Sequence, residues 1–151
     1  MTAEHPYCAA MANAEKLAQL ENVPLFRACT KGELKKIARL SEELRVPADK
    51  VLVRQGAIGR EFFFLLDGEV QISRNGKEVA VLGPGGFFGE LALLVREPRD
   101  ATATTLTPSV LLVIGQREFG ALLADSPTIA RKLLEGMAQR LRDLDRQTVT
   151  A

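Results

Sequence analysis

The sequence predicts an α+β fold in which helices at both ends flank an antiparallel β-roll, a jelly-roll-like barrel. Three observations carry this prediction. Helix-forming patterns come first, short β-branched and aromatic runs separated by turn residues follow from residue 50 onward, and a long amphipathic pattern comes last. A chain of 151 residues is long enough to bury one core, so we expect a single domain over residues 13–151.

Two helices are predicted ahead of the strands. Asn13 is a candidate N-cap for a short helix that ends at Leu20. Thr30 and Glu33 have the spacing of a capping box, which opens a second helix. This helix is expected to run through Leu44. Its apolar face is expected to consist of Leu34, Ile37, Ala38 and Leu44.

Six short segments are expected to form the strands of the roll, after which the chain returns to helix. They are residues 50–56, 61–66, 69–73, 78–82, 101–106 and 109–114. Asp67-Gly68 and Asn75-Gly76 are two-residue hairpin signals, because such pairs tolerate the positive φ of a tight turn. We expect core packing, rather than a base-stacking surface, for Phe62, Phe63, Phe64, Phe87 and Phe88.

Residues 88–103, with the sequence FGELALLVREPRDATA, have the order of groups that an anionic sugar ligand needs. Gly89 has no Cβ, so the backbone can approach a ligand closely, and a helical turn after it would aim backbone N–H groups and a positive dipole end at an anion. The guanidinium of Arg99 can hold phosphate oxygens, while the carboxylate of Glu90 can accept a hydrogen bond from a ribose hydroxyl. A cyclic nucleotide carries both groups. The alternative to a ligand site is that Gly89 is an ordinary turn glycine, Glu90 an acid at a helix N-terminus and Arg99 a surface cation.

This segment resembles the phosphate-binding cassette of the cyclic nucleotide-binding domain, found in the catabolite activator protein, in cAMP-dependent protein kinase regulatory subunits and in nucleotide-gated channels. The matching residues are Phe88, Gly89, Glu90, Leu91, Ala92, Leu93, Leu94, Pro98, Arg99, Ala101 and Thr102. The resemblance covers roughly residues 20–145 and includes VPLF, GELKKIARL, RQG, EFFFLLDGEVQIS and VLGPGGFFGE.

The resemblance implies that Glu90 binds the ribose 2′-hydroxyl and that Arg99 binds the exocyclic phosphate oxygens. It implies further contacts from backbone amides near Gly89, Leu91, Ala92 and Ala101. Asp100 departs from the family pattern, which has Ala, Ser or Thr after the arginine, and its carboxylate would weaken phosphate binding if it pointed inward. Cyclic AMP is the ligand by family habit, and cyclic GMP stays open.

Ser126 as N-cap and Pro127 at the first helical position predict a C-terminal helix that runs to about Arg146. Its apolar residues form a heptad stripe of Ala130, Leu134, Met137, Leu141 and Leu144, widened into a second face by Ile129 and Leu133. Packing against the chain's own barrel and a homodimer seam are both consistent with this pattern, and the two can coexist.

In the family this helix is a lid over the base. The resemblance therefore implies that a closed lid would cover the purine with Leu133, Met137 or the guanidinium plane of Arg140, because the helix contains no aromatic residue.

Composition argues against several other functions. The net charge of +1 has no basic cluster of the kind that direct nucleic-acid binding or a polybasic membrane patch requires. No apolar run is long enough to span a membrane and no secretion signal is visible, so we expect a cytoplasmic chain. Residues 1–12, which contain the single histidine His5, are expected to be disordered.

Cys8 and Cys29 lack metal-ligand spacing and are expected to be free thiols. With one histidine and no nucleophile-base pair, neither a catalytic metal centre nor an enzyme is expected. The leading hypothesis is therefore a cyclic nucleotide sensor that acts through movement of its C-terminal helix on an effector protein or a fused effector domain. The alternatives are a degenerate domain kept for dimerisation or scaffolding, and the sensor half of a transcription regulator.

Overall fold

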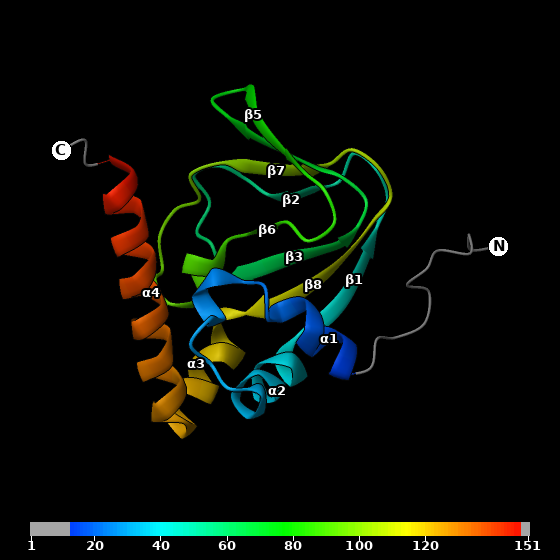
Figure 1. The fold of residues 1–151 in the computed structure, drawn as a ribbon. Coiled ribbons are helices and arrows are strands. Elements are labelled where there is room, and N and C mark those ends of the chain that lie inside the picture. Colours follow the sequence, from blue (N-terminus) through cyan, green and yellow to red (C-terminus); the bar gives the residue numbers. More distant parts are fainter. Residues whose placement is uncertain (1–12, 149–151) are drawn as a thin grey trace.

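The computed structural model describes residues 13–148, so the disorder expected for residues 1–12 lies outside the described part. It has two antiparallel sheets and flanking helices, which confirms the predicted α+β fold; the sheets form a roll rather than a closed barrel (Figure 1). The helical elements are α1 (Asn13–Leu20), η1 (Pro24–Phe26), α2 (Lys31–Leu40), η2 (Glu90–Leu93), α3 (Gln116–Asp125) and α4 (Pro127–Thr148).

The strands are divided between two four-stranded sheets. The first sheet has the order β1-β8-β3-β6 and the second β2-β7-β4-β5. Their bounds are β1 (Glu42–Val46), β2 (Val51–Val53), β3 (Glu61–Asp67), β4 (Val70–Arg74), β5 (Lys77–Leu82), β6 (Phe87–Phe88), β7 (Thr102–Thr105) and β8 (Ser109–Gly115). Figure 1 shows α1, α2 and α3 beneath the first sheet and α4 along one side of the roll.

The first sheet has apolar side chains on both faces, because successive residues of a strand point to opposite sides. On β3, Phe62 and Phe64 belong to a cluster with the helices, whereas Phe63 and Leu65 belong to a cluster with the second sheet. We call the first cluster the helix-side core; its members include Phe26, Phe62, Phe64, Ile114, Phe119, Ile129 and Leu133. We call the second the inter-sheet core, formed by Phe63, Leu65, Val70, Ala103 and Leu111.

The phenylalanines lie where core packing was expected. Phe62, Phe63 and Phe64 are buried, and Phe87 packs against the helix-side core. Phe88 stacks on Phe63 with ring centroids 4.9 Å apart. Of the five, Phe88 is also close to the ligand site described below.

The capping box of α2 is confirmed, but the predicted end of this helix is wrong. The Thr30 hydroxyl accepts from the Glu33 amide at 3.2 Å, and the Glu33 carboxylate accepts from the Thr30 amide at 2.8 Å. The helix ends at Leu40, and Leu44 lies instead in β1, opposite Leu111 of β8. Pairing with a strand far along the chain, which no local pattern reveals, overrides the helical spacing.

One of the two hairpin signals is confirmed. Asn75-Gly76 joins β4 to β5, with φ values of 54° and 81° that fit a two-residue turn. The hairpin prediction for Asp67-Gly68 is wrong, because β3 and β4 lie in different sheets and this pair carries the chain from one to the other. At Gly68 (φ 100°) a Cβ atom would lie 2.7 Å from the carbonyl oxygen of Pro108, so the crossover requires glycine.

Helix α4 begins at Pro127 as predicted and extends to Thr148. Its N-terminal half packs on the body of the domain, with Ile129 and Leu133 each 1% exposed in the helix-side core. Leu134 and Leu141 are 67% and 68% exposed, so part of the predicted stripe is open to solvent. Helix α3, which the sequence analysis did not predict, ends at Asp125, and the amide of the next residue, Ser126, donates to the Leu122 carbonyl directly before α4 begins.

Candidate ligand-binding site

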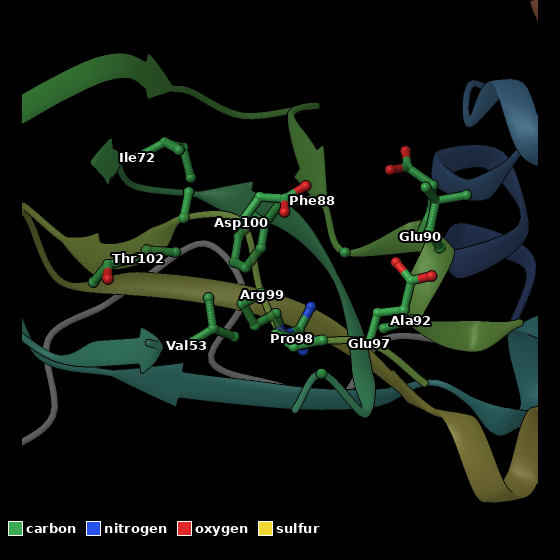
Figure 2. A pocket seen from close by; sticks show the side chains of 15 residues that line it. Val53, Ile72, Phe88, Glu90, Ala92, Glu97, Pro98, Arg99, Asp100 and Thr102 are labelled. Atoms are coloured by element: carbon green, nitrogen blue, oxygen red, sulfur yellow. The ribbon is translucent and has the colours of Figure 1, made fainter. Parts of the chain in front are cut away.

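The residues of the predicted cassette surround one pocket of about 220 Å³ at the edge of the second sheet. Its lining combines η2 and the segment after it with residues of β2, β4, β6 and β7 and with Gly59 between β2 and β3. The lining residues are Val53, Gly59, Ile72, Phe88, Gly89, Glu90, Leu91, Ala92, Glu97, Pro98, Arg99, Asp100, Ala101, Thr102 and Ala103. Figure 2 shows Val53, Ile72 and Thr102 toward one end, Glu90, Ala92 and Glu97 toward the other, and Arg99 between them. The pocket thus has an apolar end and a polar end.

Two glycines make room for the guanidinium of Arg99. A Cβ atom at Gly59 would lie 2.6 Å from Nε and 2.9 Å from Cζ of Arg99. A Cβ atom at Gly89 would collide with Nη1 of the same side chain and would lie 2.8 Å from the Glu61 carbonyl oxygen. The position of the Arg99 side chain therefore requires glycine at both positions, Gly89 in the cassette and Gly59 thirty residues earlier.

Arg99 is held by contacts that leave part of its fork available. Its Nη2 donates to the backbone carbonyl of Glu61 at 2.8 Å and lies 3.7 Å from that residue's carboxylate. Its backbone is tied to the preceding loop, since the Arg99 amide donates to Ala57 and the Arg99 carbonyl accepts from Gly56. The side chain is only 9% exposed. A cation is thus fixed at the floor of the pocket before any ligand enters.

Burial lowers the pKa of the Arg99 guanidinium, and the nearby Glu61 carboxylate opposes that shift. An arginine stays protonated under all ordinary conditions, so the result is a charged group whose partners among residues 13–148 do not use all of its donors, in a partly desolvated place. An anion bound beside it would replace the lost hydration. This is the electrostatic condition for a phosphate site.

The cassette glycine also opens the turn that carries the backbone donors. Gly89 has φ 81° and ψ 17°, a left-handed conformation, and precedes η2. The Ala92 amide donates to the Gly89 carbonyl within this turn at 3.0 Å. In the described part of the chain, the amides of Leu91 and Ala101 have no hydrogen-bond partner, and both residues line the pocket. Both amides are available to a ligand.

The structure brings together the seven predicted cassette residues, all of which line the pocket: Gly89, Glu90, Leu91, Ala92, Arg99, Asp100 and Ala101. It does not bring the lid candidates there. Leu133 is buried in the helix-side core and Met137 packs against that core, so neither lines the pocket. The side chain of Arg140 lies outside the described part of the structure.

Sequence reasoning missed the residues that position Arg99 and those that form the apolar end. Gly59 and Glu61 lie 40 and 38 residues before Arg99, so no local spacing connects them. Val53 and Ile72 look like ordinary strand residues in the sequence, and only the meeting of β2 and β4 beside β7 places them in the pocket. Glu97, also missed, brings a second carboxylate to the polar end.

No three His, Cys, Asp or Glu side chains within residues 13–148 are grouped so as to hold a metal ion. None of the helices in that range is both long enough and apolar enough to cross a bilayer.

Comparison with known proteins identifies the family. Residues 43–126 match the family model described as the cyclic nucleotide-binding domain. The chain belongs to this family. The matched segment contains the whole pocket, from β2 to β7, so the cassette resemblance seen in the sequence rests on a shared fold.

Individual relatives support the same assignment. A cyclic nucleotide-gated potassium channel of Rhizobium etli is 36% identical over 118 residues, and a cAMP-dependent protein kinase regulatory subunit of Schizosaccharomyces pombe is 35% identical over 113 residues. These alignments cover 78% and 74% of this chain but 33% and 27% of the two relatives. The crystal structure of the N-terminal domain of a transcriptional regulator from Streptomyces coelicolor A3(2) superposes with a TM-score of 0.79 at 28% identity, covering 88% of this chain and 99% of that one.

Proposed function

We propose that this domain is a cyclic nucleotide sensor, with cyclic AMP or cyclic GMP as its ligand. The observation that carries the proposal is Arg99, a charged side chain 9% exposed, fixed between two glycines at the floor of a pocket. A buried cation of this kind is matched by a phosphate, which accepts several charge-assisted hydrogen bonds at once. The name of the fission-yeast relative, a cAMP-dependent protein kinase regulatory subunit, supports cyclic AMP.

In this proposal the cyclic phosphate lies beside Arg99 and accepts hydrogen bonds from the free amides of Leu91 and Ala101. Glu90, at the polar end, accepts from the ribose 2′-hydroxyl. The purine then extends toward Val53 and Ile72, whose apolar side chains suit the faces of the ring. Each part of the ligand meets a group of matching chemistry.

The output of the sensor would be a change in the position or exposure of α4. The helix is anchored through Ile129 and Leu133, while its later turns carry the exposed Leu134 and Leu141. A ligand that binds better when α4 lies over the pocket shifts the helix toward that position by its difference in affinity, typically about 1–3 kcal/mol. An effector protein or a fused effector domain would read this shift.

Calorimetric titration of cyclic AMP and cyclic GMP into the purified chain tests the proposal. Saturable binding is expected, and Arg99→Ala should weaken it by more than about 3 kcal/mol, over 100-fold, because the phosphate loses its buried partner. Arg45→Ala is the matched control, since Arg45 is an exposed arginine of β1 outside the pocket. Equal binding by wild type and Arg99→Ala would overturn the assignment.

A second candidate function is a domain that dimerises without responding to nucleotide. It is favoured by the two leucines of α4 that are more than 60% exposed, Leu134 and Leu141, and by the carboxylate of Asp100 in the pocket. Sedimentation equilibrium distinguishes the candidates. Concentration-dependent dimers together with no heat from either nucleotide would favour this second function.

A further inference from the structure

Three arginines outside the ligand pocket surround a second cavity, of about 320 Å³. Its lining consists of Arg60, Glu61, Arg96, Gly115, Gln116, Arg117 and Glu118. All three arginines are exposed. Over residues 13–148, none of their side chains forms a hydrogen bond or an ion pair with the chain. The cavity therefore brings together three guanidinium groups whose donors are not used by the described part of the protein.

Two of these arginines face each other across a short antiparallel pairing. Ile58 forms an antiparallel bridge with Pro98. Two residues further along the same register, Arg60 stands opposite Arg96. Like charges at directly opposite positions destabilise a pair of strands. The pairing that builds the loop beside the ligand pocket thus places two cations together at a cost in stability.

The third arginine comes from the first turn of α3. The Gln116 amide donates to the Arg60 carbonyl at 2.7 Å, which holds the start of α3 beside the start of β3. Arg117 follows directly, so a helix, a strand end and the cassette segment each supply one arginine. Repulsion among three neighbouring cations opposes this arrangement, and a bound anion with more than one charge would offset it.

Two carboxylates in the same lining leave the three arginines unpaired. The carboxylate of Glu61 lies 3.7 Å from Nη2 of Arg99, which belongs to the other pocket. The carboxylate of Glu118 lies against the backbone of Gly115, where a Cβ atom would collide with Oε1 of Glu118. Within the described range, neither acid forms an ion pair with the arginines of the cavity. An entering anion would therefore meet three cations that no carboxylate already occupies.

The chemistry of the lining indicates a small and highly charged anion. Apart from Gly115, every side chain of the cavity is charged or polar, so no apolar or aromatic surface is available to an organic ring. Guanidinium groups hold phosphate oxygens through paired, charge-assisted hydrogen bonds. Phosphate and pyrophosphate fit this lining, whereas a nucleotide base would find no matching surface.

We propose that Arg60, Arg96 and Arg117 form a second anion-binding site, for a small polyvalent anion of the phosphate or pyrophosphate type. It is distinct from the cyclic nucleotide pocket, since the two cavities share no lining residue. They share two backbone segments instead. Gly59 and Glu97 line the first pocket, and their chain neighbours Arg60 and Arg96 line the second.

Calorimetric titration of pyrophosphate into the full chain, in a phosphate-free buffer, tests the site. Saturable binding at or below about 1 mM is expected, and it should weaken as NaCl is raised because the arginines are exposed. Arg60→Gln, Arg96→Gln and Arg117→Gln should each weaken it about three- to tenfold, and their combination should abolish it. Arg131→Gln is the matched control, because it removes the same charge from an exposed arginine of α4 outside the cavity.

Three further arms define the site and its ligand. Glu118→Gln should tighten pyrophosphate binding about two- to fivefold, since it removes a repelling carboxylate, and an unfolded variant could not produce this gain. Arg99→Ala should retain saturable pyrophosphate binding, because Arg99 lies in the other pocket. ADP should bind no more tightly than pyrophosphate. The thermal midpoint of each variant confirms that it folds.

Four results would overturn the inference. Pyrophosphate could give no saturable heat with the wild-type chain. Its binding could be lost in Arg99→Ala and kept in the triple variant, which would place the anion in the first pocket. Arg131→Gln could weaken it as much as Arg117→Gln, which would indicate non-specific attraction. ADP could bind more than tenfold more tightly than pyrophosphate, which would contradict the class of ligand.

The same samples separate this inference from the sensor function. Cyclic AMP and cyclic GMP are titrated into the wild-type chain beside pyrophosphate. Binding of pyrophosphate without binding of either nucleotide would overturn the sensor function and support the second site, because no step of the inference depends on nucleotide binding. Binding of a nucleotide without binding of pyrophosphate would overturn the second site alone.

Discussion

The two hydrophobic cores of the domain differ in how completely they are closed. In the helix-side core, Phe62, Phe64 and Phe119 are each 0% exposed, and helices cover the sheet. The inter-sheet core is smaller and is bordered by partly buried side chains such as Ile72 and Phe88, which also line the pocket. One core is sealed, whereas the other opens onto the ligand site.

This difference separates stability from binding. A closed core contributes free energy of folding in proportion to the apolar area it buries. An open one leaves apolar surface for a purine and places polar groups at its margin. Variants in the helix-side core should therefore change the free energy of unfolding, and variants around the pocket should change affinity.

The largest expected effect is on stability, from Phe64→Ala. Phe64 is fully buried in the helix-side core, so its removal should lower the free energy of unfolding by about 3–5 kcal/mol. Urea denaturation measures this, and nucleotide affinity of the folded variant should stay within threefold of wild type. A tenfold loss of affinity with unchanged stability would show that the two cores are not separate in function.

Two neighbouring residues of α4 provide the next comparison. Leu133 is 1% exposed and Leu134 is 67% exposed. Leu133→Ala should lower the free energy of unfolding by about 2–5 kcal/mol, whereas Leu134→Ala should stay within about 0.5 kcal/mol of wild type. Both are measured by urea denaturation of dilute protein, where any dimer is dissociated. Equal losses for the two variants would mean that α4 packs differently from the structure described.

The glycines with positive φ provide a matched pair for the pocket. Gly89 and Gly85 have φ values of 81° and 91°, but a side chain would meet Arg99 at Gly89 and nothing within 4 Å at Gly85. Gly85→Ala should lower the free energy of unfolding by about 1–2 kcal/mol, and Gly89→Ala by more, because its Cβ would also meet the Glu61 carbonyl oxygen. Only Gly89→Ala should also weaken cyclic nucleotide binding, by at least about tenfold in calorimetry, since it displaces the guanidinium. Loss of binding in Gly85→Ala as well would point to a general effect of backbone strain.

The smallest expected effect concerns Cys29, which packs against the helix-side core. Burial raises the pKa of its thiol from 9.0 to about 11, with the Glu33 carboxylate adding to the shift and Lys132 opposing it. Between pH 9 and 11 the unfolded thiol therefore loses its proton while the folded thiol keeps it, so stability falls as pH rises. Relative to Cys29→Ala, the free energy of unfolding of the chain with Cys29 should fall by about 1 kcal/mol between pH 9 and 11, a value reduced because the thiol is partly exposed.

The measurement is urea denaturation at the two ends of that pH interval, with Cys8→Ser as the background so that one thiol titrates. If the free energy of unfolding had the same pH dependence with and without Cys29→Ala in the Cys8→Ser background, the Cys29 thiol would not be shielded by the core.

The sequence predicted those parts of the fold that have a local signal. The Thr30–Glu33 capping box, the Asn75-Gly76 turn and the start of α4 at Pro127 are each encoded within a few residues. Strand β1 and the crossover at Gly68 depend on partners distant in the chain, so local spacing gave a longer helix and a false hairpin there.

The same distinction applies to the site. The cassette residues lie within one short segment, and their collection around one pocket follows from it. The contacts of Arg99 with Gly59 and Glu61, and that of Arg74 with Asp100, join segments more than twenty residues apart. Such contacts exist only after the sheets have formed, and no periodicity or composition could predict them.

A crystal structure of the chain with a bound cyclic nucleotide tests the central claim most directly. The phosphate oxygens should lie within hydrogen-bond distance of the Arg99 guanidinium, about 2.7–2.9 Å, above the floor formed by Gly59 and Gly89. A nucleotide whose phosphate lay elsewhere, with Arg99 still bound only to Glu61, would contradict the account.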